Sequence, residues 1–234
     1  IPDIFSEDEW AEIKSKHYIH ELGYMSNLSP DYENIIKIGL LEARKTADEY
    51  SRRSIDAIIG LADRYKEEAA KQGRDDIVAT LNRVPRYGAT NLREALQFFR
   101  IIHYALWLEG NYHNPCGRFD KYMYPYFEAD LARGVGEDEL FETLEEFFIS
   151  LNFDTDLYMG VQQGDNGQSM VLGGVDKDGN DCFNLLSELC LEASRALLVV
   201  FLGKRLLDHI AANDGKKDKR YNRTDGADYR IVEF

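Results

Sequence analysis

The sequence contains few cysteines and fewer positive than negative charges, and each shortage argues against a class of protein. Its three cysteines (Cys116, Cys182 and Cys190) are an odd number without regular spacing, which favours reduced thiols in the cytoplasm over a disulfide framework. Its 28 lysines and arginines face 42 aspartates and glutamates, a formal net charge of -14. This charge argues against duplex nucleic acid or an anionic membrane as the main partner.

The sequence also lacks a recognisable signal peptide, and its apolar run at residues 196–202 is too short to span a bilayer. It begins with Ile1 rather than methionine, so we expect a processed product or part of a longer chain. No internal repeat or low-complexity segment is present. With 44% hydrophobic and 30% charged residues, the 234 residues suit a soluble globular protein of one large or two small domains.

Most of the sequence carries the apolar spacing of amphipathic helices. Capping patterns mark helix starts at Ser6 with Glu9, at Asn91 with Glu94, and at Asn184. Pro125 suits the first position of another helix. We expect helices at residues 6–16, 29–65 (with kinks at Gly39 and Gly60), 75–81, 91–109, 125–133, 137–151 and 184–193, the fourth buried on most sides from Phe98 onward.

Strand signals are fewer. Residues 170–172 predict a strand that ends at Gly173 and Gly174, and residues 229–234 suit either a short strand or a tail. Asp176 and Asp178 lack the further acidic positions of a calcium loop, so the segment 176–179 predicts a tight turn.

The segment before the predicted strand, residues 152–168, is long, polar and rich in glycine. Loops of this length without structure of their own are often functional. Neutral hydrogen-bonding groups gather at its end, and they suit a polar small molecule: Gln162, Gln163, Gln168 and Ser169.

Histidines give weak metal signals. His17 and His20 are three residues apart, and His113 lies three residues before Cys116, but no third ligand follows either pair at a suitable spacing. We therefore expect no metal site. His103 lies in an apolar helix and is interpreted as a satisfied core histidine.

Several pieces of the sequence, in the same order and spacing, resemble the glycyl radical enzymes, the pyruvate formate-lyase family with its dehydratase and lyase relatives. They are EALQFF (94–99), GRFD (117–120), YPYFEADLARG (124–134), LGGVDKDGND (172–181) and NLLSELCLEAS (184–194), with HELGYMSNLSPDYENIIKIGLLE (20–42) upstream. The resemblance covers residues 15–195 and implies the N-terminal to central part of a ten-stranded α/β barrel. We expect residues 1–195 to form a helical front with the first barrel elements, and residues 196–234 a divergent helix and tail. Alone, the chain should be predominantly α-helical with a few short strands.

The resemblance also implies radical chemistry. In that family an S-adenosylmethionine iron–sulfur activase installs a backbone glycyl radical, whose spin passes to a cysteine that attacks the substrate. This sequence lacks both the Arg-Val-x-Gly-Tyr loop and the Gly-Cys-Val-Glu motif; Cys190 has the Cys-x-Glu spacing but lies in a packing helix. We therefore expect no catalytic residue and no bound cofactor in this chain, and no activity of the chain alone.

Relatives line their substrate cavity with the loop before Leu-Gly-Gly, which implies substrate contacts from Gln162, Gln163, Gln168 and Ser169. Arg118 and Asp120 are expected to form a structural ion pair, and Gly173 and Gly174 are expected to be structural.

Two functions stay open. The first is part of a glycyl radical lyase, dehydratase or formate acetyltransferase-like enzyme, cleaving C–C, C–O or C–N bonds of a small polar metabolite, with an activating enzyme as partner. The second is a non-catalytic binding or interaction protein derived from this fold. A homo-oligomer is compatible with both.

Overall fold

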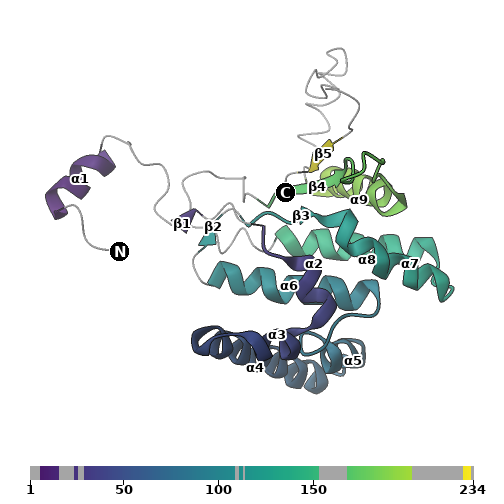
Figure 1. Ribbon diagram of the computed structural model, residues 1–234, viewed down its shortest axis with the longest axis horizontal. Coiled ribbons are helices and arrows are strands. Elements are labelled where there is room, and N and C mark those ends of the chain that lie inside the picture. Colours follow the sequence, from purple (N-terminus) through teal and green to yellow (C-terminus); the bar gives the residue numbers. More distant parts are fainter. Residues whose placement is uncertain are drawn as a thin grey trace, which may run out of the picture.

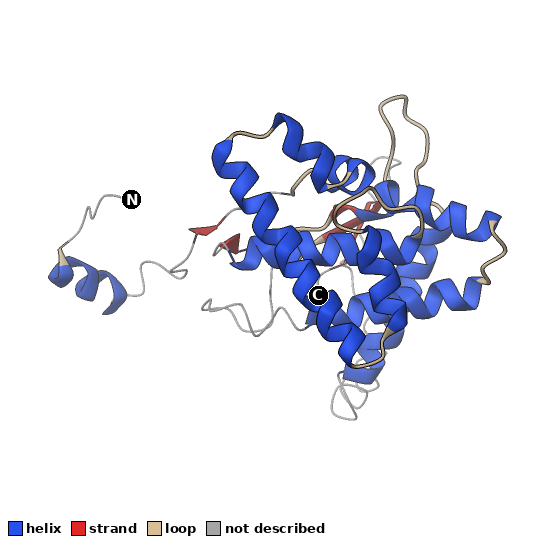
Figure 2. Ribbon diagram, turned by 90° about the horizontal axis from the view of Figure 1, so that it is seen from below, coloured by secondary structure: helices blue, strands red, loops and turns tan. Residues whose placement is uncertain are grey.

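The computed structural model describes residues 6–15, 24–25, 29–108, 111–112, 114–152, 168–201 and 229–232. Helices dominate these residues, and the strands are short (Figure 2). In chain order the elements are α1 (Glu7–Ser15), β1 (Tyr24–Met25), α2 (Tyr32–Ile38), α3 (Leu40–Thr46), α4 (Glu49–Lys71), α5 (Asp75–Arg83), α6 (Leu92–Leu108), β2 (Asn111–Tyr112), β3 (Gly117–Arg118), α7 (Phe119–Ala132), α8 (Glu137–Asn152), β4 (Met170–Gly173), α9 (Leu185–Phe201) and β5 (Tyr229–Val232). The prediction of a mainly helical chain is confirmed.

Helix α6 lies at the centre of the arrangement (Figure 1). It contacts α2, α4 and α5 as well as α7 and α8, so it connects the first group of helices to the second. The predicted helix at residues 137–151 is confirmed as α8, and five apolar side chains at helical spacing are all buried in it: Leu140, Leu144, Phe147, Phe148 and Leu151.

Aromatic rings fill the core between these helices. Phe119 stacks on Phe147 with ring centroids 5.2 Å apart, and Phe99 meets Phe147 edge to face at 5.4 Å. Both arrangements avoid the repulsive face-to-face geometry of aromatic rings. The core therefore fixes α6, α7 and α8 relative to one another.

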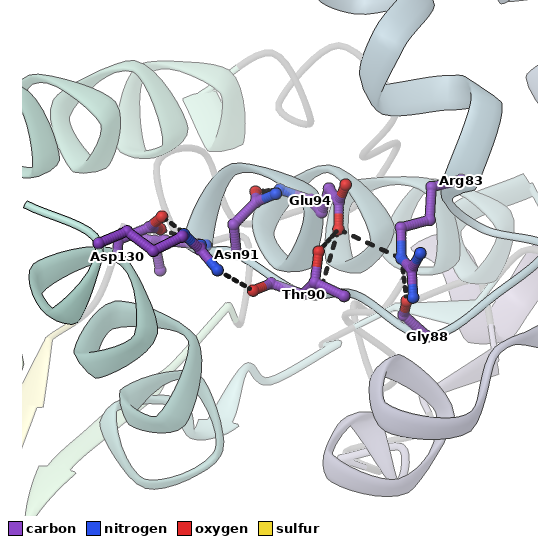
Figure 3. A network of polar contacts seen from close by, with 8 residues as sticks. Arg83, Gly88, Thr90, Asn91, Glu94 and Asp130 are labelled. Carbon is purple, nitrogen blue, oxygen red and sulfur yellow. Dashed lines mark hydrogen bonds and ion pairs between the residues drawn. The ribbon is translucent and has the colours of Figure 1, made fainter. Parts of the chain in front are cut away.

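A polar network holds the start of α6 (Figure 3). Asn91 caps the helix by accepting a bond from the Glu94 N–H at 2.8 Å, and Glu94 Oε2 accepts bonds from the N–H and hydroxyl of Thr90. Asp130 of α7 accepts the Leu92 N–H at 2.7 Å, which ties the free N–H groups of one helix start to another helix. The predicted cap at Asn91 is confirmed, as are those at Ser6 and Asn184.

Two short sheets accompany the helices. β1 pairs in parallel with β2, and the three-stranded sheet has the order β3–β4–β5. β3 and β4 are parallel, with Gly117 opposite Met170, whereas β5 runs antiparallel to β4. The strand predicted at residues 170–172 is confirmed and extends to Gly173, and residues 229–232 form a strand rather than a tail.

The predicted helix at residues 29–65 is divided into three helices. The first break is at Gly39, as expected, where φ is +84 and a Cβ would lie 2.5 Å from the carbonyl carbon of Tyr87. The second break is at Ala47, which has an extended backbone, and Asp48 then caps α4. Gly60 lies within α4, which continues through it without a break, and the kink predicted there stays a prediction. A helical glycine costs about 1 kcal/mol but needs no break.

Two further expectations concern single helices, and the one about Pro125 was wrong. Helix α7 begins at Phe119, so Pro125 lies inside it rather than at its first position. Pro125 removes one backbone bond, to the carbonyl of Lys121, and both residues are exposed, so water can satisfy that carbonyl. The expected burial of the second half of α6 is confirmed up to Trp107, since its side chains are buried or half-buried, whereas Leu108 at the helix end is 59% exposed.

Candidate functional site

The entrances of β3 and β4 lie side by side. The N–H of Cys116 donates to the carbonyl oxygen of Ser169 at 2.8 Å, and the Cys116 thiol lies 3.7 Å from the carbonyl oxygen of Gln168. Asn114, Cys116 and Gln168 are almost fully buried. Buried polar side chains need partners, so this place can hold polar groups in a fixed orientation. We call Asn114, Cys116, Gln168 and Ser169 the strand-entry cluster.

Two charged side chains converge on Gly173 at the other end of β4. The guanidinium of Arg118 donates to the carbonyl oxygens of Gly173 (3.1 Å) and Val175 (3.2 Å). Asp120 Oδ2 accepts the N–H of Gly173 at 2.5 Å and the hydroxyl of Ser187 at 2.6 Å. We call Arg118, Asp120, Gly173 and Ser187 the strand-exit cluster.

The strand-exit cluster joins four elements. Arg118 ends β3, Asp120 lies in the first turn of α7, Gly173 ends β4 and Ser187 lies in the first turn of α9. Gly173 has φ of +71, a left-handed conformation that favours glycine, so it can turn the chain away from the strand. Among the described atoms Arg118 and Asp120 share Gly173 rather than forming the direct ion pair expected from the sequence.

Burial dominates the electrostatics of Asp120. Loss of water around this fully buried carboxyl raises its pKa, while the bonds from Ser187 and Gly173 and the charge of Arg118 act in the opposite direction. The Asp120 carboxyl thus links β4 to α9 through two buried hydrogen bonds.

The structure describes only some of the residues that the sequence predicted to contact the substrate. Gln168 is buried and Ser169 half-buried in the strand-entry cluster, whereas Gln162 and Gln163 lie outside the described residues. Their roles as substrate contacts, and the structural roles of Arg118, Asp120, Gly173 and Gly174, stay predictions. Cys190 is fully buried in α9, and burial raises the pKa of its thiol well above the usual value.

Metal chemistry receives no support from the described part of the chain. No group of three or more His, Cys, Asp or Glu side chains is placed there to hold a metal ion. Residues 176–179 form the predicted turn: Asp176 accepts the N–H groups of Asp178 and Asn180 with its own carboxylate. His17, His20 and His113 lie outside the described residues.

Sequence reasoning missed three polar residues at these clusters. Asn114 had no distinguishing neighbour in the sequence, and the partner of Ser187 lies 67 positions away. Tyr122 donates its hydroxyl to the carbonyl oxygen of Cys116 at 2.6 Å and so fixes the chain that enters β3. Only the cap pattern at Asn184 could have drawn attention to Ser187, because Asn184 and Ser187 form reciprocal bonds at the start of α9.

The sequence was compared with models of known protein families. The family described as pyruvate formate lyase-like matches residues 6–200. The chain belongs to this family. The pyruvate formate lyase-like chain is thus a member of the glycyl radical enzymes, as the sequence motifs indicated, and its relatives use a protein radical.

Individual relatives support the assignment. The chain is 27% identical over 172 residues to the (2S)-3-sulfopropanediol dehydratase of Klebsiella oxytoca, an alignment that covers 70% of this chain and 20% of the relative. It is 32% identical over 132 residues to the 4-hydroxyphenylacetate decarboxylase glycyl radical subunit of Clostridioides difficile, covering 53% of this chain and 15% of the relative.

A solved glycyl radical enzyme from Archaeoglobus fulgidus superposes with a TM-score of 0.62 at 22% identity, covering 81% of this chain and 30% of that one. This likeness shows that the chain adopts part of the barrel fold of these enzymes. The chain spans about a fifth of the length of the curated relatives it matches.

Proposed function

We propose that this chain forms the helical front and first barrel strands of a glycyl radical lyase or dehydratase acting on a small polar metabolite. The observation that carries the proposal is the parallel pair β3–β4, entered through a buried polar cluster and clamped to α7 and α9 at its exit. Parallel barrel strands with polar groups at their ends are a scaffold on which enzymes place substrate sites.

The substrates named for two relatives support a substrate class for this chain. Sulfopropanediol and trans-4-hydroxy-L-proline, named for two relatives, are small molecules that carry hydroxyl groups. Neutral amide and hydroxyl side chains such as Gln168 and Ser169 can donate to and accept from such groups. We propose a hydroxylated metabolite, contacted by Gln162, Gln163, Gln168 and Ser169.

Catalysis needs groups that these 234 residues do not contain. Neither the glycine loop nor the Gly-Cys-Val-Glu motif is present, and Cys190 is packed inside α9. The family's glycyl radical supplies hydrogen-atom abstraction when it is installed. The residues here would bind and orient the substrate and exclude water from it. We propose that the chain alone is inactive, that it acts in the cytoplasm, and that the full enzyme needs a radical-installing activase.

Substrate binding is tested by titrating the chain with (2S)-3-sulfopropanediol, isethionate, trans-4-hydroxy-L-proline and glycerol, followed by calorimetry. We expect one of these hydroxylated compounds to bind, and binding to be lost in the double variant Gln162→Ala, Gln163→Ala. The matched control is Gln72→Ala on the exposed end of α4. Binding that survives the double variant and the control alike contradicts the assignment of the loop.

The radical is tested separately. The chain is incubated anaerobically with an activating enzyme and S-adenosylmethionine, and its electron paramagnetic resonance spectrum is recorded beside that of a full-length relative. We expect the relative to give a glycyl doublet and this chain to give none. A doublet from this chain refutes the view that the radical site is missing.

A second candidate is a non-catalytic interaction protein, and it is favoured by one observation. A groove of about 680 Å³ lies between α4, α5 and α6, with Ala62, Ala69 and Leu81 buried beneath it. Its wall on the side of α6 includes Gln97, Arg100, Ile101 and Tyr104. Two results together would favour this candidate over the enzyme. The loop variant would leave binding of the metabolites unchanged, and the chain would self-associate with rising concentration in sedimentation.

A further inference from the structure

A buried phenol and a buried imidazole are hydrogen-bonded in the core, beside Tyr122, whose hydroxyl bonds to Cys116 of the strand-entry cluster. The Tyr32 hydroxyl of α2 lies 2.8 Å from Nδ1 of His103, in the α6 helix that contacts α2 (Figure 1). Tyr32 is 1% exposed and His103 is fully buried. Neither residue of this pair belongs to the proposed substrate site.

The two side chains are enclosed by aromatic rings. Phe99 stacks on His103 with centroids 5.0 Å apart and lies 4.3 Å from the Tyr32 ring. Tyr122 stacks on Tyr32 at 6.0 Å, and Trp107 meets His103 at 6.2 Å. These rings exclude water and leave the imidazole as an adjacent base for the Tyr32 hydroxyl.

His103 can accept a proton from Tyr32. Burial, with a smaller contribution from the charge of Arg100, lowers its pKa to about 3, so the imidazole is neutral at physiological pH. We assign the ring proton to Nε2, which leaves Nδ1 as the acceptor of the phenolic O–H. An oxidised phenol is a far stronger acid than an imidazolium, so even this weak base takes the proton once an electron has left.

Tyr122 offers the contrasting case within the same stack. Its hydroxyl donates to the backbone carbonyl oxygen of Cys116 at 2.6 Å. A carbonyl oxygen accepts a hydrogen bond but does not take up the proton. Burial also raises the pKa of Tyr122 well above its usual value. Oxidation of Tyr122 would therefore leave a positive charge in the core, whereas oxidation of Tyr32 would place that charge on an adjacent base.

We propose that Tyr32 and His103 form a buried one-electron donor, in which an oxidising radical takes an electron from Tyr32 while the phenolic proton passes to Nδ1 of His103. The oxidant is an organic radical, such as a thiyl radical, that has escaped its reaction site. It gains the electron and becomes an anion, Tyr32 becomes a neutral tyrosyl radical, and His103 becomes an imidazolium. Atoms and electrons balance, and reduction of the tyrosyl radical returns the proton to the phenol. The inference rests on the proposed radical enzyme for its oxidant, but not on the identity of the substrate, and an added oxidant tests it independently.

The test oxidises the whole chain with photogenerated tris(bipyridine)ruthenium(III) and follows tyrosyl radicals by electron paramagnetic resonance. The chain has 14 tyrosines, so the wild-type spectrum is compared with those of Tyr32→Phe and Tyr122→Phe. Each variant removes one buried phenolic hydroxyl and nothing else. We expect the persistent tyrosyl signal to be lost in Tyr32→Phe and retained in Tyr122→Phe. An unchanged signal in Tyr32→Phe, or an equal loss in both variants, overturns the proposal.

A measurement on the wild-type chain covers the case in which Tyr32→Phe does not fold. Electron–nuclear double resonance of the persistent radical, in light and in heavy water, reports protons hydrogen-bonded to the phenoxyl oxygen. We expect one strongly coupled exchangeable proton, from the Nδ1–H of His103, that disappears in heavy water. A persistent radical without an exchangeable proton refutes the pairing of Tyr32 with His103.

Discussion

Replacing Asp120 tests whether the strand-exit cluster holds the barrel strands to the helices. In Asp120→Ala, two buried donors lose their acceptor: the N–H of Gly173 and the hydroxyl of Ser187. An unsatisfied buried donor costs about 1–3 kcal/mol, and removal of a desolvated carboxylate offsets part of the sum. We therefore expect Asp120→Ala to lower the free energy of unfolding by about 3 kcal/mol, a large share of the stability of a typical domain.

Asp120→Asn separates the hydrogen bonds from the charge. The amide oxygen keeps an acceptor for both donors, and burial already disfavours the charged carboxylate, as its raised pKa shows. We expect this variant to lose less than about 1 kcal/mol. Because the pKa of Asp120 is higher in the folded state than in the unfolded state, the folded state binds more protons. The Asp120 carboxyl therefore makes the wild-type free energy of unfolding fall as pH rises from about 3.8, the unfolded pKa, through the folded pKa. Both variants should lose that dependence.

The assay is urea unfolding followed by circular dichroism at several pH values, with Asp178→Asn in the exposed turn after β4 as the control. Equal destabilisation by alanine and asparagine would show that the charge matters more than the acceptor and would contradict the electrostatic argument. A loss below about 1 kcal/mol in Asp120→Ala would show that water or a rearrangement satisfies the two donors.

Two other perturbations test the core and the front helices. Burial lowers the pKa of His103 to about 3 in the folded state, against 6.5 in the free side chain, so the unfolded state binds the proton first. The free energy of unfolding should therefore fall as pH drops from 6.5 towards 3, by at most about 1.4 kcal/mol per pH unit. In urea unfolding at several pH values His103→Phe should remove this dependence, and an unchanged slope would assign it to other groups. Gly88→Ala should destabilise the chain by about 3 kcal/mol or more in thermal unfolding, because the new Cβ would lie 1.9 Å from the carbonyl oxygen of Lys37. Its matched control, Gly60→Ala, has nothing within 4 Å and should stabilise α4 by about 1 kcal/mol; equal effects of the two alanines would refute the close approach of the two segments.

Local signals explain why much of the fold could be predicted from the sequence. The caps at Ser6, Asn91 and Asn184 depend on a partner three residues away, so the sequence shows both members of each bond. The buried stripe of α8 repeats at helical spacing and needs no knowledge of what it contacts. Both kinds of signal are complete within one turn or one helix.

The errors lie where distant contacts or solvent exposure decide the outcome. Pro125 was placed at a helix start because its missing N–H costs nothing there, yet its position on an exposed face lets α7 continue past it. Apolar residues in the second half of α6 predicted burial, which holds up to Trp107 and fails only at Leu108. The contact of Asp120 with Ser187 spans 67 positions and has no signal in either local pattern.

The motifs that carry the family resemblance meet at one place in the structure, and this limits what they can reveal about function. Gly-Arg-Phe-Asp supplies Arg118 and Asp120, Leu-Gly-Gly supplies Gly173, and the motif beginning at Asn184 supplies Ser187, so three separate motifs form the strand-exit cluster. In this structure they connect β3 and β4 to α7 and α9, and we expect every substrate to require that connection equally. The motifs therefore identify the scaffold. The choice of substrate depends on side chains outside the scaffold, such as those of the loop before β4. A change in that loop should alter which metabolite binds without loosening the clamp, and a change in the clamp should weaken binding of every metabolite alike.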